Sequence, residues 1–390
     1  MATSEELHTA GQDTEHAKCP SCGGEMAFDP DSGALNCPYC GKNQEIISSQ
    51  DINCHDFAYT GEELEQKEDP GVLLHCNNCG ANIVVGPNTS ADFCTFCGSP
   101  MMAKAENSKA MVPDGIVPFR ISQKAASSLF KDWIRGRFFS PGKLKRQNQP
   151  GRLQGAYIPH FAYDCTTSSD YTAEAGEHYY VTESVTVERD GKQVQEMQEV
   201  QKTRWYSVSG THDDAFDNVL VNASKHVNQK LIKMQFDLRD LRPFQKDYIY
   251  GFVAESNSIS KDECWTTARG IIEDEIRNNI SDSIEADEVR NVNFRTDYQD
   301  VRFKQVLLPL WISAYTFKGK TYHFMINGQT GDVKGQAPLS FLRILSSILL
   351  TLGVSALFYQ WKPTAGVIAF IVSIITLMIL ANRKPKKSST

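Results

Sequence analysis

The chain has 390 residues, of which 41% are hydrophobic, and a formal net charge of −7. This length allows two or three domains, and the polar, acidic start predicts that no signal peptide is present. The charge is uneven, because residues 1–100 hold 16 Asp and Glu against three Lys, whereas residues 120–152 hold nine Lys and Arg against one Asp. Such an asymmetry bears on the partners of a protein rather than on its fold.

Four segments make up the first hundred residues. Residues 1–17 are polar and short of apolar side chains, so we expect a disordered acidic arm. Residues 18–42 and 73–100 each carry two CxxC pairs with fourteen residues between them, which indicates an internal repeat of one structural unit. Residues 43–72 link the two copies and contain a run of acidic residues. We interpret this linker as a solvated spacer rather than as an acidic docking motif.

The repeated cysteines predict two metal sites. Eight of the eleven cysteines lie in CxxC pairs, a spacing typical of metal binding rather than of disulfides. Four thiolates at this spacing fit tetrahedral zinc and leave no open position for water or substrate, so we predict two zinc ribbons, each with one structural Zn²⁺ ion. The predicted ligands are Cys19, Cys22, Cys37, Cys40, Cys76, Cys79, Cys94 and Cys97. Redox-active CxxC pairs are the alternative, but no βαβ pattern surrounds them.

Size and charge suggest what the two ribbons do. A module of about 25 residues cannot bury a sufficient core alone, so the metal is expected to supply folding energy. Binding to nucleic acid requires Lys and Arg at the phosphates, and neither ribbon has one between its first and last cysteine. We therefore expect the ribbons to contact proteins rather than nucleic acid. Cys54 and His55 in the linker are interpreted as packing residues, because both ligand sets are already complete.

Residues 112–338 predict an α+β body with antiparallel sheets. Ser122 is a candidate N-cap for a helix through Arg135, and Ser260 with Glu263 forms a capping box for a helix to about Asn279. The predicted buried face of this second helix consists of Trp265, Ala268, Ile271, Ile272 and Ile276. Strands are expected at 155–161, 181–188, 193–200, 205–208, 292–303, 306–317 and 321–326, with a hairpin turn at Asp190-Gly191. Residues 213–250 predict a mixed region with a polar helical segment.

A second, weaker repeat lies within this body. Residues 156–161 resemble residues 306–311 in sequence, and a predicted helix precedes each. We therefore expect two related units, at about 112–210 and 245–338.

The basic segment 120–152 has several interpretations. It can be a solvated face, a surface for anionic lipid headgroups, an internal partner for the acidic head, or a nucleic-acid site. Attachment to a membrane favours lipid over nucleic acid.

Two apolar runs near the C-terminus, 341–361 and 364–382, predict a transmembrane α-helical hairpin. Each has about the length that crosses a ~30 Å hydrocarbon core, and neither contains an acidic residue. The tail 383–390 is basic, and positive residues stay on the cytoplasmic side, so both termini are predicted to be cytoplasmic. The alternative is a buried helical pair in the core of a soluble protein.

No catalytic residue can be named from the sequence. Phosphate-binding, dinucleotide-binding, nucleophile-elbow and HExxH motifs are absent. Cys165 and Cys264 lie beside apolar residues and are interpreted as packing thiols. Scattered histidines are expected at the surface or in the core: His160, His178, His212, His226 and His323. The protein is therefore predicted not to be an enzyme.

Several motifs together resemble one family, the bacterial proteins with transcription-factor-IIB-type zinc ribbons, which are often named primosomal protein N′ or superfamily II helicase. The motifs are those at 18–24, 78–83, 116–119, 157–160, 308–311, 322–324 and 327–331. The resemblance covers about residues 18–338, and Asn327-Gly-Gln-Thr-Gly331 is its most specific part. The chain lacks the ATP-binding motifs of a helicase, which puts the helicase name in doubt for this sequence.

The resemblance implies a place and partners for the protein. Members of this family with C-terminal membrane helices are similar to components of envelope-stress modules in the bacterial plasma membrane, which implies association with flotillin-like and phage-shock-type proteins. The leading hypothesis is a non-enzymatic, multi-pass membrane adaptor that docks cytoplasmic proteins at the inner leaflet. The rival hypotheses are a nucleic-acid-processing factor of helicase or replication type, and a hydrolase with an unrecognised site in the α+β body.

Overall fold

The computed structural model describes most of the body and both cysteine-rich segments. The described residues are 18–47, 51–58, 72–85, 94–97, 99, 112–147, 153–189, 192–227, 231–232, 234–317, 320–361 and 363–382. The predicted acidic arm, most of the acidic linker, the Asp190-Gly191 turn and the basic tail lie outside these residues.

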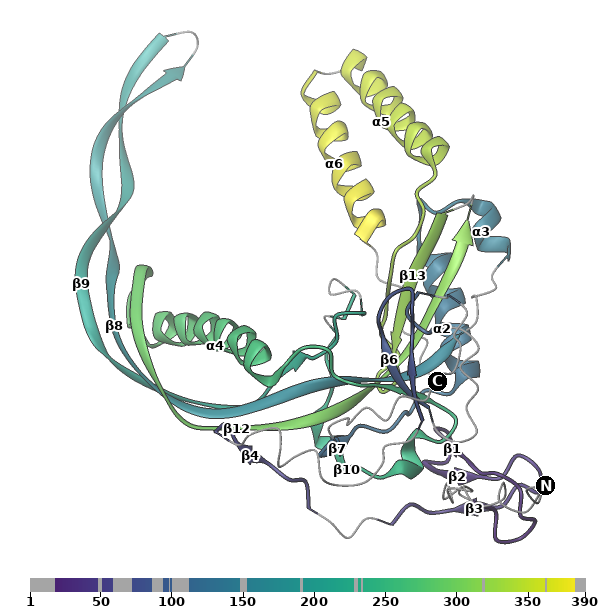
Figure 1. The fold of residues 1–390 in the computed structure, drawn as a ribbon. Helices are drawn as coiled ribbons and strands as arrows, with labels where there is room; N and C mark the ends of the chain where they lie inside the picture. Colours follow the sequence, from purple (N-terminus) through teal and green to yellow (C-terminus); the bar gives the residue numbers. More distant parts are fainter. Residues whose placement is uncertain are drawn as a thin grey trace, which may run out of the picture.

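Two sheets organise the described chain (Figure 1). A small antiparallel sheet of the first cysteine segment has the order β1-β2-β3, and an 11-stranded mixed sheet has the central order β10-β7-β12-β8-β11-β6-β5. The strands of the small sheet are β1 (Ala27–Asp29), β2 (Ala34–Asn36) and β3 (Asn43–Gln44). Those of the large sheet are β4 (His55–Asp56), β5 (Val72–His75), β6 (Asn82–Val85), β7 (Gly115–Ile116), β8 (Gln154–Arg189), β9 (Lys192–Asn222), β10 (Arg242–Pro243), β11 (Val253–Glu255), β12 (Glu288–Phe317), β13 (Lys320–Asn327) and β14 (Val333–Gly335).

Helices cover parts of the large sheet and end the described chain. They are α2 (Gln123–Gly136), α3 (Gly142–Gln147), η1 (Leu238–Asp240), η2 (Lys246–Ile249), α4 (Lys261–Ser283), α5 (Phe341–Trp361) and α6 (Pro363–Asn382). The polar helical segment predicted within 213–250 is wrong. Strand β9 continues to Asn222, and only the two short 3-10 turns η1 and η2 follow in the described part of this region.

Three strands are far longer than predicted. β8, β9 and β12 have 36, 31 and 30 residues, so the predicted break between residues 303 and 306 is wrong. The polar residues there stay in the strand because each has a partner. The Lys304 ammonium donates to the Asp164 carboxylate over 3.1 Å, and the Gln305 amide donates to Asp114 over 2.8 Å. Bulges in the β12–β8 pairing absorb the remaining irregularity.

The predicted hairpin is present but extends much further than its turn signal indicates. β8 and β9 pair from His160↔Asn222 out to Arg189↔Lys192, while the pairing of β12 with β8 ends at Glu288↔Gly176. Beyond that pair, residues 177–189 and 192–204 form a two-stranded ribbon, here called the arm. Figure 1 shows the arm curving away from the sheet on the same side as α5 and α6.

The two resembling segments of the body lie side by side in one sheet. Segment 156–161 of β8 runs antiparallel to segment 306–311 of β12, with Ile158 opposite Leu308. Each long strand also pairs in parallel with the short strand of the other half, β7 with β12 and β11 with β8. The order short strand, helix, long strand therefore occurs twice, and the two copies exchange their short strands across the centre of the sheet.

The N-cap half of the capping box predicted for α4 is confirmed, because the Ser260 hydroxyl accepts from the Glu263 amide over 3.2 Å. Its predicted buried face is partly wrong. Ile271 is exposed and Trp265 is half-buried. The buried residues are Cys264, Ala268, Ile272, Ile276 and Ile280. They repeat every four residues, so the face that packs on the sheet is a narrow stripe, and a neighbouring isoleucine points to solvent.

Helices α5 and α6 lie next to each other at the end of the described chain (Figure 1). Residues 341–360 of α5 form the one helix in the described part of the chain that is long and apolar enough to cross a membrane, and α6 holds a shorter apolar stretch, residues 367–376. Thr351 in the middle of α5 is 8% exposed, whereas Leu349 is 60% exposed. The Thr351 hydroxyl donates to the Ser347 carbonyl over 2.9 Å, so its polarity is satisfied within the helix.

We expect Thr351→Leu to weaken the packing of α5 on α6, by on the order of 1 kcal/mol, because small residues allow close approach of membrane helices. Leu349→Ala is the matched control and should have little effect, since Leu349 is exposed. The measurement is disulfide cross-linking between cysteines placed in the two helices of the full chain. Equal cross-linking losses in both variants would show that Thr351 has no special place in the contact.

Candidate metal centres

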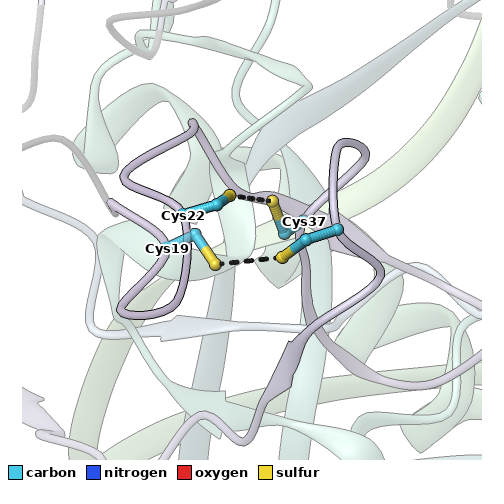
Figure 2. Close-up of side chains that lie close together, drawn as sticks. Cys19, Cys22 and Cys37 are labelled. Carbon is cyan, nitrogen blue, oxygen red and sulfur yellow. Dashed lines mark hydrogen bonds between the residues drawn. The ribbon is translucent and has the colours of Figure 1, made fainter.

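The first cysteine segment brings its four predicted ligands together. The sulfur atoms of Cys19, Cys22, Cys37 and Cys40 all lie within 4.8 Å of one another. Figure 2 shows Cys19, Cys22 and Cys37 with their sulfur atoms close together. The Sγ–Sγ distances are 3.5 Å for Cys19–Cys40 and for Cys22–Cys37. The second segment repeats this arrangement, with 3.6 Å for Cys76–Cys97 and for Cys79–Cys94. All eight predicted ligand residues therefore gather in two clusters of four.

The sulfur geometry fits a metal ion rather than disulfides. A disulfide requires two sulfurs about 2.05 Å apart, and all eight thiols are free. Tetrahedral zinc holds each sulfur at about 2.3 Å, which places neighbouring ligands about 3.8 Å apart. The distances in both clusters are close to that value. The residues present therefore fit two Zn²⁺ ions, each with four thiolate ligands and no open position for chemistry.

The backbone of each cysteine pair is folded in the same way. The amide of the first cysteine donates to the carbonyl five residues later in all four pairs, from Cys19 to Gly24, Cys37 to Lys42, Cys76 to Ala81 and Cys94 to Ser99, over 2.7–2.9 Å. Gly23, Gly41 and Gly80 follow the second cysteine of their pairs with φ of +72°, +73° and +78°. A side chain at such a φ is strained, which explains why glycine follows these pairs.

In the first cluster the pKa is lowered for two thiols, Cys19 and Cys37, and raised for the other two, Cys22 and Cys40. Burial acts to raise the pKa of Cys19, but bonds from the Ser21 and Cys22 amides outweigh it and lower the pKa to about 6. The Gly24 amide acts to lower the pKa of Cys22, yet the thiols of Cys37 and Cys40 outweigh it and raise the pKa to about 12. Four negative sulfurs therefore cannot coexist here without a cation, and a divalent ion removes that repulsion.

The second cluster also contains thiols of lowered and of raised pKa. Burial acts to raise the pKa of Cys97, but hydrogen bonds led by the Asn78 and Ser99 side chains lower it to about 6. Burial raises the pKa of Cys79 to about 11 and also raises that of Cys94. Each cluster thus combines thiols of lowered and raised pKa, and a bound metal ion would deprotonate such a set of ligands together.

The two clusters differ in how they join the body. In the first segment, the amide of Phe28 donates to the Tyr250 carbonyl over 3.0 Å, and its ring meets Tyr248 edge-on at 5.4 Å. The segment thus docks as a separate small sheet. In the second segment, β6 pairs with β11, so this cluster lies at the end of a hairpin that belongs to the large sheet.

A polar network beside the second cluster could not be found from the sequence. The Glu255 carboxylate is buried and accepts from the Ser224 hydroxyl over 2.8 Å, and it pairs with His226 Nδ1 at 2.7 Å. The His226 ring lies 6.0 Å from that of Phe96, within the second cysteine segment. Ser224 and Glu255 are 31 positions apart in the sequence, and no known sequence motif contains them together with His226. The hydroxyl donates to the carboxylate rather than to the histidine, so the network has no activated nucleophile.

The remaining sequence candidates do not form a third centre in the described part of the chain. Cys54 donates its thiol to Asp164 at 3.6 Å, and His55 pairs with Asp114 at 2.7 Å, so both have partners within the body. Burial lowers the pKa of His160 to about 4, which keeps it neutral in the core. Cys165 and Cys264 are buried, as predicted for packing thiols.

The specific motif Asn327–Gly331 is a structural turn that fastens three segments. The Asn327 side chain accepts from the Gln329 and Thr330 amides over 2.8 and 3.0 Å. The Gln329 side chain bonds the backbone of Asp237 and the carboxylate of Asp240. A Cβ at Gly328 would lie 2.5 Å from the Phe119 ring, so only glycine fits there. The motif forms the connection between β13 and β14. Its contacts link this connection to the 237–240 turn and to Phe119 in the core.

These observations define a class of protein, with two closed tetrathiolate centres on a mixed sheet and a C-terminal helix able to cross a membrane. No family model matches the sequence, and no solved structure matches it. The chain is similar to the protein named "Uncharacterized protein YdjG" of Bacillus subtilis (strain 168). The two are 26% identical over 328 residues, which cover 83% of this chain and 90% of YdjG. That name states no activity, so the function must be argued from the site.

We expect the purified full chain to contain two zinc ions and to lose them at different rates. A chelator should remove the first ion faster, because Cys22 and Cys40 are exposed while Cys79 and Cys97 are half-buried. Zinc release is followed with a colorimetric indicator in the wild type and in Cys22→Ser and Cys79→Ser variants, each of which keeps one intact centre. A protein with one ion or none, whose eight thiols all react with iodoacetamide in the native state, would contradict the assignment.

Proposed function

We propose that this protein is a non-enzymatic, membrane-anchored adaptor whose two zinc ribbons and α+β body dock cytoplasmic proteins at the inner leaflet of the bacterial plasma membrane. The observation that carries the proposal is the pair of closed four-cysteine clusters on a chain with a membrane-length apolar helix. Zinc with four thiolate ligands offers no position for a substrate. Its role is then to shape a surface, and the apolar helix fixes where that surface is displayed.

An exposed apolar surface on the first ribbon supports a docking role. Tyr39 lies between two zinc ligands and is 74% exposed, and Ile47 shortly after the ribbon is 83% exposed. Large apolar side chains held outward on a rigid metal-bound loop are typical of contact points for proteins. The resemblance to zinc-ribbon proteins of envelope-stress modules extends the proposal to flotillin-like or phage-shock-type partners.

The membrane topology is part of the proposal. We infer that α5 and α6 cross the bilayer as a hairpin, with the connection at Lys362 outside and both termini in the cytoplasm. The basic tail after α6 supports this orientation, because Lys and Arg remain on the cytoplasmic side. The free thiols of the protein agree with a reducing compartment for the body.

The rival proposal is a nucleic-acid-processing factor of helicase or replication type. It is favoured by the name often given to the resembling family. It is disfavoured by the sequence, which has no phosphate-binding loop, and by ribbons without Lys or Arg between their ligands.

For the topology, we expect a fluorescent protein fused after Thr390 to be fluorescent in intact bacteria, and alkaline phosphatase fused there to be inactive. Phosphatase inserted at Lys362 should be active, because that position is predicted to face outward. Phosphatase activity at the C-terminus with none at Lys362 would reverse or remove the proposed hairpin.

For docking, a photo-crosslinking amino acid in place of Tyr39 should yield a discrete protein adduct in living cells. The same substitution at Tyr180 on the arm, also exposed, serves as the matched control. The adduct at Tyr39 should disappear in a Cys22→Ser background, because the metal holds the loop. DNA-dependent ATP hydrolysis by the purified chain, with no adduct at Tyr39, would favour the helicase proposal instead.

A further inference from the structure

We propose that the junction between the body and α5 binds the phosphate headgroups of anionic phospholipids. The junction, here called the collar, consists of residues 137–143 after α2 and residues 339–343 at the start of α5. This inference rests on the proposed membrane anchoring and adds to it a lipid class and the residues that select it.

Hydrogen bonds fasten the two parts of the collar to each other. The Ser340 amide donates to the Phe139 carbonyl over 2.8 Å, and Arg343 Nη1 donates to the Phe138 carbonyl over 2.9 Å. Figure 1 shows α3, which begins within the collar, beside the start of α5. Leu144 of α3 is buried and anchors this side to the body. The loop is therefore held at the depth at which α5 enters the membrane.

The collar exposes large apolar side chains on both parts. Phe138, Leu339, Phe341 and Leu342 are all exposed, the last three by 70% or more. Such a group of side chains is costly in water. At a bilayer surface the same side chains enter the boundary between headgroups and acyl chains, and their transfer becomes favourable. The collar is continuous with the apolar surface of α5, which identifies the occupant as lipid.

The collar also carries positive charge. No acidic residue lies close to it in the sequence. Residues 133–163 and 333–390 contain no Asp or Glu. Lys143 is exposed, and the described partner of Arg343 is a neutral carbonyl, which leaves the guanidinium charge uncompensated. Arginine is costly in hydrocarbon but stable at the headgroups. An anionic phosphate at this depth supplies the missing negative charge.

Because Gly142 has no side chain, the Arg343 guanidinium can lie close to the loop backbone. A Cβ at this position would lie 3.2 Å from Arg343 Nη2, closer than an ordinary van der Waals contact. The loop therefore passes the arginine closely on one side, and the remaining N–H donors of the guanidinium can bind phosphate in the planar, two-point manner that arginine favours.

The test measures lipid selectivity on the full chain. The protein is reconstituted in phosphatidylcholine vesicles with trace spin-labelled phosphatidylglycerol or spin-labelled phosphatidylcholine, and electron spin resonance gives the fraction of each lipid immobilised by protein. We expect phosphatidylglycerol to be preferred several-fold. Lys143→Gln and Arg343→Gln should each reduce the preference, by up to roughly fivefold for a cation at the membrane surface.

Controls separate charge from folding. Arg295→Gln removes an exposed arginine that lies opposite Asp170 in the β12–β8 pairing, outside the collar, and should keep the wild-type preference. Arg343→Lys should keep most of it, since the charge remains. Each variant must bind two zinc ions and show the wild-type circular dichroism. Loss of the preference in 50 mM inorganic phosphate at constant ionic strength would assign the site to free phosphate and overturn the lipid proposal.

Two failures are distinguishable. If neither lipid is immobilised, the proposed membrane anchoring is wrong. If both lipids are immobilised equally in the wild type, or if the double variant Lys143→Gln/Arg343→Gln keeps the full preference, the anchoring stands and the collar does not select anionic lipid.

Discussion

The pairing of β8 with β12 is the interaction on which the rest of the structure depends. It runs from Gln154↔Ile312 to Gly176↔Glu288, and its apolar inner segment is buried on both faces. The short strands β7 and β11 are added on its two sides, and through β11 it also carries β6 and β5 of the second cysteine segment. The aromatic core forms beside it, where Phe119 stacks on Phe252 at 4.3 Å. A disruption of this central pair would release both halves and one metal centre.

The two metal centres consequently have different relations to folding. The first segment has three short strands of its own and packs on the body around Met26, Phe28 and Leu35, so a bound metal ion would add much of its order. The second shares strand pairing with the large sheet, so metal binding and sheet formation stabilise each other. An identical ligand spacing in the sequence therefore does not imply an identical structural role. One copy is suited to present a surface, and the other to close the edge of the body.

Local signals in the sequence predicted local structure well. The four-cysteine sets, the N-cap at Ser260 and the hairpin of β8 and β9 each depend on residues close to one another in the sequence. The strand lengths could not be predicted, because Lys304 and Gln305 look like a break until Asp164 and Asp114, distant in sequence, are brought to them. The predicted buried face of α4 was right at Ala268, Ile272 and Ile276 but wrong at Ile271, which is exposed. A helical period alone does not tell which of two adjacent isoleucines faces the sheet.

The arm sets a condition on how the protein meets a membrane. It is a two-stranded ribbon whose outer edges are not paired in the described chain, with ionic side chains such as Lys202 and Glu183 paired on its surface. Hydrocarbon excludes unpaired backbone groups and ion pairs of this kind, so the arm belongs in water. Yet it rises on the same side of the sheet as α5 and α6 (Figure 1). With those helices in a bilayer, the arm and the helices cannot occupy the same depth. Among the described residues, no third strand pairs with the arm beyond Gly176, and an isolated hairpin is only marginally stable. If the helices enter a bilayer, the arm must therefore lie in the water beside it.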